Sequence, residues 1–141
     1  MYNYLLSNPC HFSSIMLIFV LPVTIYCNNN ILLVTEIPLS LTTIIYHNKI
    51  KCNENIRIID ISVGQLAYWQ HVIYAVNNNN IASITCYFVC PIIFSISKYY
   101  ERKGEMYLSN LIHSFIHYFL LLGTLFINLT TPKASGLFMS A

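Results

Sequence analysis

The chain alternates between long apolar runs and short polar segments. Five apolar runs cover roughly residues 12–27, 31–47, 56–76, 81–97 and 107–127. A helix needs about 20 residues to cross the hydrocarbon core of a bilayer. Backbone in lipid must satisfy its own hydrogen bonds, which favours helices over isolated strands. The pattern therefore predicts an all-α, polytopic membrane bundle of about five transmembrane helices, forming a single domain over residues 1–141.

Composition supports a lipid environment. The chain is 56% hydrophobic and only 9% charged, whereas an ordinary soluble domain is about 25% charged. Its five cysteines have no CxxC spacing, so neither a disulfide framework nor a zinc ribbon is indicated. We expect membrane lipids as the environment and no nucleic-acid partner.

The basic residues predict an orientation. With five spans, one side of the membrane carries the N-terminus and the two polar loops at 48–55 and 97–106. Six of the seven basic residues belong to that side, and only Lys133 belongs to the other. The positive-inside rule then places the N-terminus in the cytoplasm and the C-terminus on the opposite side. The glycosylation sequon at 128–130 falls on that opposite side.

Polar residues inside the runs indicate a site, because ionisable groups in a membrane span are costly. Thr43 and His47 share one helical face with Glu36 and Ser40, since the four are separated by steps of four, three and four residues. His113 and His117 lie one turn apart on one face, a spacing that suits two imidazoles on one metal ion.

Topology predicts that the candidate ligands meet. His47 ends the second run, Asp60 lies near the start of the third, and His113 and His117 lie in the first half of the fifth. All four therefore reach a similar depth on the cytoplasmic side. Helix–helix hydrogen bonding remains an alternative for the histidine pair, as a structural or proton-relaying role does for Asp60.

Other ionisable residues are excluded from this site. His71 falls at the far end of its run, and His11 precedes the first run. Glu36 lies about three turns, roughly 16 Å, from His47. We expect Glu36 to be a protonated carboxyl that bonds a neighbouring helix.

Three segments resemble the superfamily of seven-helix membrane hydrolases that includes progestin/adiponectin-type receptors, hemolysin III-like proteins, alkaline ceramidases and myomaker-like proteins. Residues 43–47 (TIIYH) resemble its Ser-x3-His motif, with Thr43 in place of the usual serine. Residues 57–62 (RIIDIS) resemble the start of the next helix, and 113–124 (HSFIHYFLLLGT) resemble the last helix. The chain is two helices short of seven, and a homo-oligomer or partner helices would replace the missing pair.

The resemblance implies a zinc ion held by His47, His113 and His117, with Asp60 activating a water molecule. Zinc with three neutral imidazoles keeps an open coordination position, and the Thr43 hydroxyl would donate to the developing oxyanion. The implied activity is hydrolysis of a lipid amide or ester, ceramidase-like in class. Three alternatives stay open: a metal-bearing receptor or remodelling protein without turnover, a small viroporin-like channel, and a remnant without metal.

Overall fold

The computed structural model describes residues 9–47 and 54–130, and every regular element within these ranges is helical. The all-α prediction is confirmed. The first rod of the bundle is made of three consecutive pieces, and four long helices follow. The elements are α2 (Pro9–Met16), η1 (Leu17–Phe19), α3 (Val20–Tyr26), α4 (Asn30–His47), α5 (Glu54–Asn77), α6 (Ile81–Arg102) and α7 (Met106–Thr130).

Helix ends differ from the predicted runs mainly at the polar loops. α6 continues to Arg102, so the turn before α7 spans only 103–105 instead of 97–106. α2 begins at Pro9, which places His11 inside the first rod rather than before it. The 3₁₀ turn η1 directly precedes α3, which contains Pro22. A proline has no N–H for the preceding turn, and this accounts for the break there. The predicted loop residues 48–53 and Lys133 lie outside the described residues.

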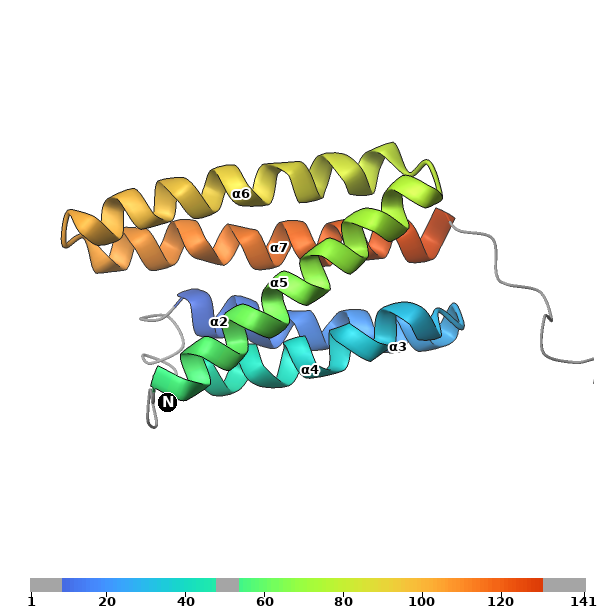
Figure 1. The fold of residues 1–141 in the computed structure, drawn as a ribbon, viewed down its shortest axis with the longest axis horizontal. Coiled ribbons are helices and arrows are strands. Elements are labelled where there is room, and N and C mark those ends of the chain that lie inside the picture. Colours follow the sequence, from blue (N-terminus) through green and yellow to red (C-terminus); the bar gives the residue numbers. More distant parts are fainter. Residues whose placement is uncertain (1–8, 48–53, 131–141) are drawn as a thin grey trace, which may run out of the picture.

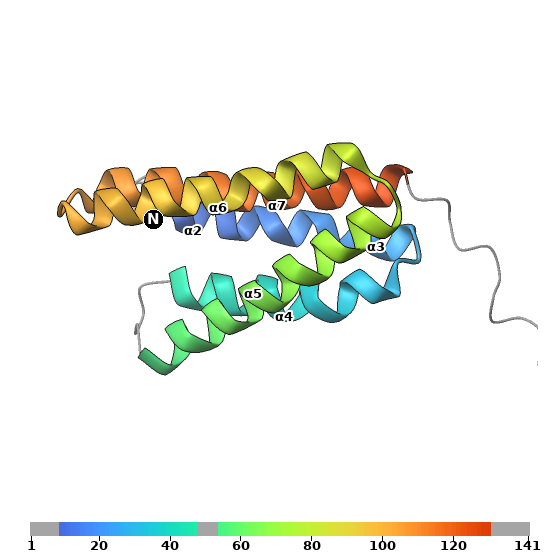
Figure 2. The same ribbon diagram turned by 45° about the horizontal axis from the view of Figure 1, so that its top comes forward.

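The first rod lies between α7 and α4 and contacts both (Figures 1 and 2). α6 lies alongside α7 for most of its length, and α4 runs beside the first rod. α5 begins next to the end of α4 and crosses the bundle obliquely to reach the start of α6 (Figures 1 and 2). One end of the bundle therefore holds the starts of α2, α5 and α7 together with the ends of α4 and α6.

Three turns between helices use the same backbone device. Asn28, Asn79 and Gly104 have φ of 54°, 50° and 81°. In each turn the N–H of this residue donates to the carbonyl oxygen three residues earlier, and the N–H of the next residue donates to the carbonyl oxygen five residues before it. This is the Schellman arrangement, in which a left-handed residue ends the helix and satisfies its last carbonyls. Asparagine tolerates that conformation better than other residues with a side chain, so the two Asn-rich segments work as helix stops.

The polarity of the molecule is inverted relative to a soluble protein. Polar side chains fill much of the interior, including Ser13, Thr24, Ser83 and Asn128, each 3% exposed or less. Large apolar side chains cover the outside instead. Examples are Phe19, Val34, Leu66, Phe88 and Leu129, all more than 60% exposed. An outer surface of this kind is stable against lipid and prone to association in water.

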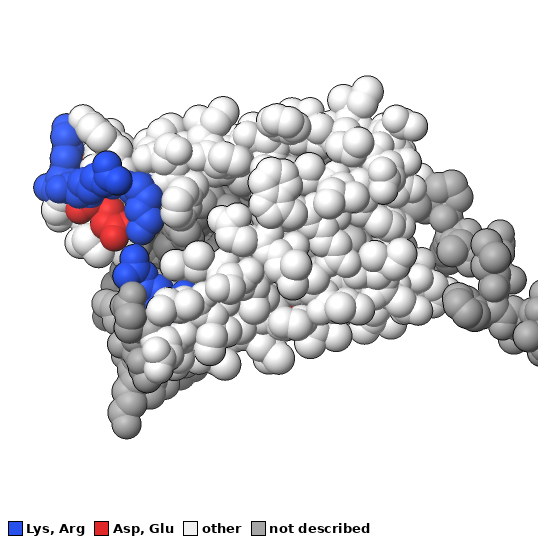
Figure 3. All heavy atoms as spheres, in the orientation of Figure 1, with Lys and Arg blue, Asp and Glu red and all other residues white. Residues whose placement is uncertain are grey.

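Membrane embedding follows from the helices themselves. The first rod (Pro9–Tyr26), α6 and α7 are each long and apolar enough to cross a bilayer. α4 includes Glu36, and α5 includes Arg57 and Asp60. Charged side chains gather at one end, while the rest of the visible face lacks them (Figure 3). We conclude that the chain is an integral membrane protein.

The sequon at 128–130 lies in the last turn of α7, and its asparagine is not available as an acceptor. Asn128 is 3% exposed. Its side chain donates to Thr24 at 2.7 Å and accepts from Asn29 at 3.2 Å. Asn128 is therefore a packing residue that ties α7 to the first rod and to the start of α4.

Gly123 permits the close packing of α6 on α7. A Cβ at this position would lie 2.5 Å from the Tyr87 ring, and the Gly123 carbonyl accepts a bond from Ser83 at 2.8 Å. Tyr87 is fully buried, with its hydroxyl 3.3 Å from that of Thr124, so the ring has nowhere to move.

We therefore expect Gly123→Ala to destabilise the protein by about 1–3 kcal/mol, the usual cost of overpacking. Gly64→Ala is the matched control, because a Cβ there meets only Leu39, at 4.0 Å, and alanine is the better helix former. Thermal unfolding in mild detergent should show a lower midpoint for Gly123→Ala alone. Equal midpoints for the two variants would contradict this account of the interface.

Candidate metal centre

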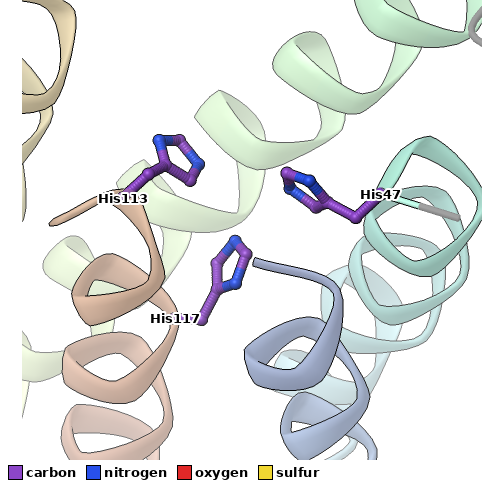
Figure 4. A group of neighbouring side chains, drawn as sticks. All are labelled: His47, His113 and His117. Atoms are coloured by element: carbon purple, nitrogen blue, oxygen red, sulfur yellow. The ribbon is translucent and has the colours of Figure 1, made fainter. Parts of the chain in front are cut away.

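Three histidine rings converge at the end of the bundle that carries the charged residues. His47 comes from the last residue of α4, and His113 and His117 come from successive turns of α7 (Figure 4). One ring nitrogen from each residue forms a group in which all atoms lie within 4.8 Å of one another. The ring centroids are 5.3 to 5.8 Å apart. Two helices that are distant in sequence thus present three nitrogen donors to one point.

The histidine cluster is largely screened from solvent. His117 is 6% exposed, while His47 and His113 are half-buried. The His113 ring also packs edge-on against Phe94 of α6, with centroids 6.2 Å apart. Rings held by packing keep their donor atoms in place, which a metal site requires.

Ser13 of α2 determines how His117 presents its nitrogens. The Ser13 hydroxyl lies 2.7 Å from His117 Nδ1 and also donates to the Cys10 carbonyl at 3.1 Å. A serine hydroxyl has one hydrogen. Both bonds form together only when that hydrogen points to the carbonyl and Nδ1–H donates to Ser13 Oγ. The lone pair is then on Nε2, and the second nitrogen of the ring points toward the other two histidines (Figure 4).

This arrangement is the one that metal sites commonly use. A ligating histidine donates its other N–H to a protein oxygen, which fixes the tautomer and the ring orientation. The group consists of three histidine nitrogens, and within the described residues no Asp, Glu or Cys belongs to it. Three neutral imidazoles suit zinc with an open coordination position. The residues present therefore fit a zinc ion.

Thr43 lies one turn before His47 on α4, and Asp60 lies in the second turn of α5. Thr43 Oγ1 donates to Asp60 Oδ1 at 2.9 Å and joins α4 to α5. Thr43 is 3% exposed and Asp60 is half-buried. The single hydroxyl hydrogen of Thr43 is used on Asp60 in this structure, and the expected donation to an oxyanion stays a prediction. In this structure Thr43 positions the carboxylate.

A polar cavity adjoins the histidines. Its volume is ≈ 260 Å³, and its lining includes charged residues of this end of the bundle. It is bordered by Tyr46, His47, Arg57, Ser97, Lys98, Glu101, Met106, Ser109, Asn110 and His113. Its size is sufficient for a small polar group beside the histidine cluster.

Two of the ionisable residues that the sequence excludes from the centre pair with each other. His71 and Glu36 contact each other elsewhere in the bundle, 3.3 Å apart. His11 is 8% exposed on α2 and is not part of the three-histidine group. Sequence reasoning missed Ser13, because a serine in an apolar run has no periodic partner and its contact with His117 spans 104 positions.

Comparisons of the chain with family models, with curated proteins and with solved structures gave no match. The resemblance to the seven-helix hydrolases therefore stays a prediction, carried by the three motif segments alone.

The centre makes a direct prediction about metal content. Protein purified in mild detergent should contain about one zinc per chain, as expected for a site with three histidine ligands. The double variant His113→Ala/His117→Ala should contain none. His71→Gln is the control, because His71 lies outside the group. Elemental analysis of all three proteins provides the measurement, and zinc-free, well-folded wild type would rule out the site.

The role of Ser13 is tested separately. Loss of such an outer partner typically weakens metal affinity by about 10–100-fold, and we expect this for Ser13→Ala. Ser14→Ala is closely matched, because Ser14 is also fully buried and bonds only the His11 carbonyl, at 2.8 Å. Competition with a chelator of known affinity gives both constants. Similar constants for the two variants would show that Ser13 does not orient His117.

Proposed function

We propose that the protein is a zinc-dependent intramembrane hydrolase of a lipid amide or ester. The observation that carries the proposal is the convergence of His47, His113 and His117 beside a polar cavity. Thr43, one turn before His47 on α4, holds the Asp60 carboxylate by a hydrogen bond. The resemblance of the motif segments to the seven-helix hydrolases agrees with the same residues. A purely structural zinc site would be closed by a fourth protein ligand, and no fourth ligand joins the group among the described residues.

The proposal includes five membrane spans. α4 and α5 have 18 and 24 residues, enough in length to accompany the three apolar helices across a bilayer. Buried residues such as Glu36 and Thr43 give α4 much of its polarity while its outer face is apolar. All Lys and Arg side chains of the described residues lie at the histidine end. By the positive-inside rule that end is cytoplasmic.

Each site residue has a distinct part in the proposed reaction. The three histidines would hold zinc, which supplies Lewis acidity and lowers the pKa of water toward about 7. Asp60 would accept a proton as general base. Thr43 would keep the Asp60 carboxylate in place through its hydrogen bond. Ser13 would keep His117 in the tautomer that leaves Nε2 free to bind.

The substrate class follows from the surroundings of the site. The outer surface of the bundle is apolar, so substrates meet it from the bilayer. The cavity beside the histidines is polar and carries Arg57, Lys98 and Glu101. A molecule with a polar head and long hydrocarbon chains satisfies both environments. An amide or ester near the head of such a lipid would lie at the depth of the histidines.

The decisive experiment separates zinc binding from turnover. Asp60→Asn keeps an oxygen that can accept from Thr43 but removes the base. We expect zinc content to be unchanged and hydrolysis of ceramide-like amides and of lipid esters to fall by about 10²–10⁴-fold, the usual contribution of general base catalysis. Thr43→Val should reduce turnover without loss of zinc, whereas Thr43→Ser should restore it.

Wild type that binds one zinc but hydrolyses none of these lipids would contradict the enzymatic proposal. That result would favour a metal-bearing membrane protein without turnover. Activity retained by Asp60→Asn would instead remove Asp60 from the mechanism and leave the zinc site intact.

A further inference from the structure

Glu36 of α4 and His71 of α5 form a second polar centre, deep in the bundle and apart from the three histidines. Their exposed fractions are 3% and 2%. Glu36 Oε1 lies 3.3 Å from His71 Nε2, and His71 Nδ1 lies 2.6 Å from the Ala67 carbonyl oxygen. The pair joins two helices where neither the zinc site nor the proposed reaction needs it.

The hydrogen-bonding partners fix where the protons are. A carbonyl oxygen only accepts, so His71 Nδ1 must carry a hydrogen. Neutral imidazole has one N–H, so Nε2 is then an acceptor. A contact between Nε2 and a carboxyl oxygen requires one further proton between them. Two charges in an apolar interior are costly unless hydrogen bonds surround them, which favours the neutral form with the proton on Glu36.

The second carboxyl oxygen of Glu36 faces a small cavity. Glu36 Oε2 is buried and has no hydrogen-bond partner among the described residues. A cavity of ≈ 20 Å³ lies beside it, and its polar lining comes from Glu36, Ser40, His71 and Thr124. A water molecule needs roughly 10–15 Å³ of this measure and two to four polar partners. The cavity meets both conditions for one water.

Neighbouring helices bring no opposing charge to the pair. The rest of the cavity wall is apolar and comes from the first rod, α4, α5 and α7. From α6, the Tyr87 ring lies 5.9 Å from the His71 ring, and its hydroxyl is near Thr124. No Lys, Arg, Asp or other Glu lines the cavity within the described part of the chain.

We propose that Glu36 and His71 form a proton-binding site inside the bundle. The pair holds one exchangeable proton, carried by Glu36 Oε1 and donated to His71 Nε2, and Oε2 binds one water molecule in the adjoining cavity. Ser40, which lines the cavity, and Thr43 follow Glu36 on the buried face of α4, and Thr43 bonds Asp60. The proposal does not depend on the hydrolase activity or on zinc.

Infrared spectroscopy of the protein in lipid nanodiscs at neutral pH tests the proton. Wild type should show a carboxylic-acid C=O band that shifts in D₂O. Glu36→Gln should lack this band, and its amide can still donate to His71, so the fold is retained. Glu101→Gln is the control, because Glu101 is paired with Lys98 at the protein surface. Absence of a band lost specifically in Glu36→Gln would overturn the proposal.

Two further measurements test the partner and the water. Nitrogen NMR of His71 should show a hydrogen on Nδ1 and none on Nε2; a doubly protonated ring would overturn the assignment of the proton to Glu36. Ser40→Val should fill the cavity, keep the band and slow its shift in D₂O, whereas Ser95→Val on the exposed face of α6 should not. Equal exchange in the two variants would overturn the water site.

Discussion

Hydrogen bonds between buried polar side chains are the interaction on which this bundle depends. Lipid is as apolar as leucine, so apolar faces gain little by leaving it, and helices associate through close packing and polar contacts instead. The Ser97 hydroxyl donates to the Ser109 carbonyl, and the Ser109 hydroxyl donates to the Ser97 carbonyl, where α6 turns into α7. At the opposite end Asn128 bonds Thr24 and Asn29. Single bonds of this kind contribute on average only about 0.6 kcal/mol, so the fold needs many of them, and its interior is polar for that reason.

The helices and their inward faces were predictable because both follow from local rules. A repeat of three and four residues places Glu36, Ser40 and Thr43 on one face whatever the tertiary structure, and all three are buried. The ends of helices were harder to predict. α6 continues through charged residues to Arg102, because a change from apolar to polar side chains does not by itself end a helix. Hydropathy marks the edge of the bilayer, whereas Gly104 with its positive φ marks the end of the helix.

The candidate site also has a part that local rules predict and a part that they do not. The meeting of His47 with His113 and His117 follows from depth and spacing, which topology determines. Ser13 and the bond from Thr43 to Asp60 depend on how helices are rotated against each other, and a single sequence does not contain that rotation. The bond from Thr43 to Asp60 was therefore not predicted, and a role of the Thr43 hydroxyl toward an oxyanion stays a prediction. Chemistry can be inferred from residue types at a common depth, whereas the direction of each hydrogen bond requires the packed structure.

The two buried histidines with identified partners show how one rule gives different chemistry. His117 and His71 both donate from Nδ1 to a protein oxygen, which leaves the Nε2 lone pair as the functional atom. The Nε2 lone pair of His117 faces two more imidazoles, and the three rings together are a set of neutral donors suited to a divalent cation. Around His71 the lone pair meets the Glu36 carboxyl, which brings its own proton and satisfies the lone pair without a metal. The backbone carbonyl or hydroxyl that accepts from Nδ1 sets the tautomer of each ring, and the groups that face Nε2 determine whether the centre is suited to a metal ion or to a proton.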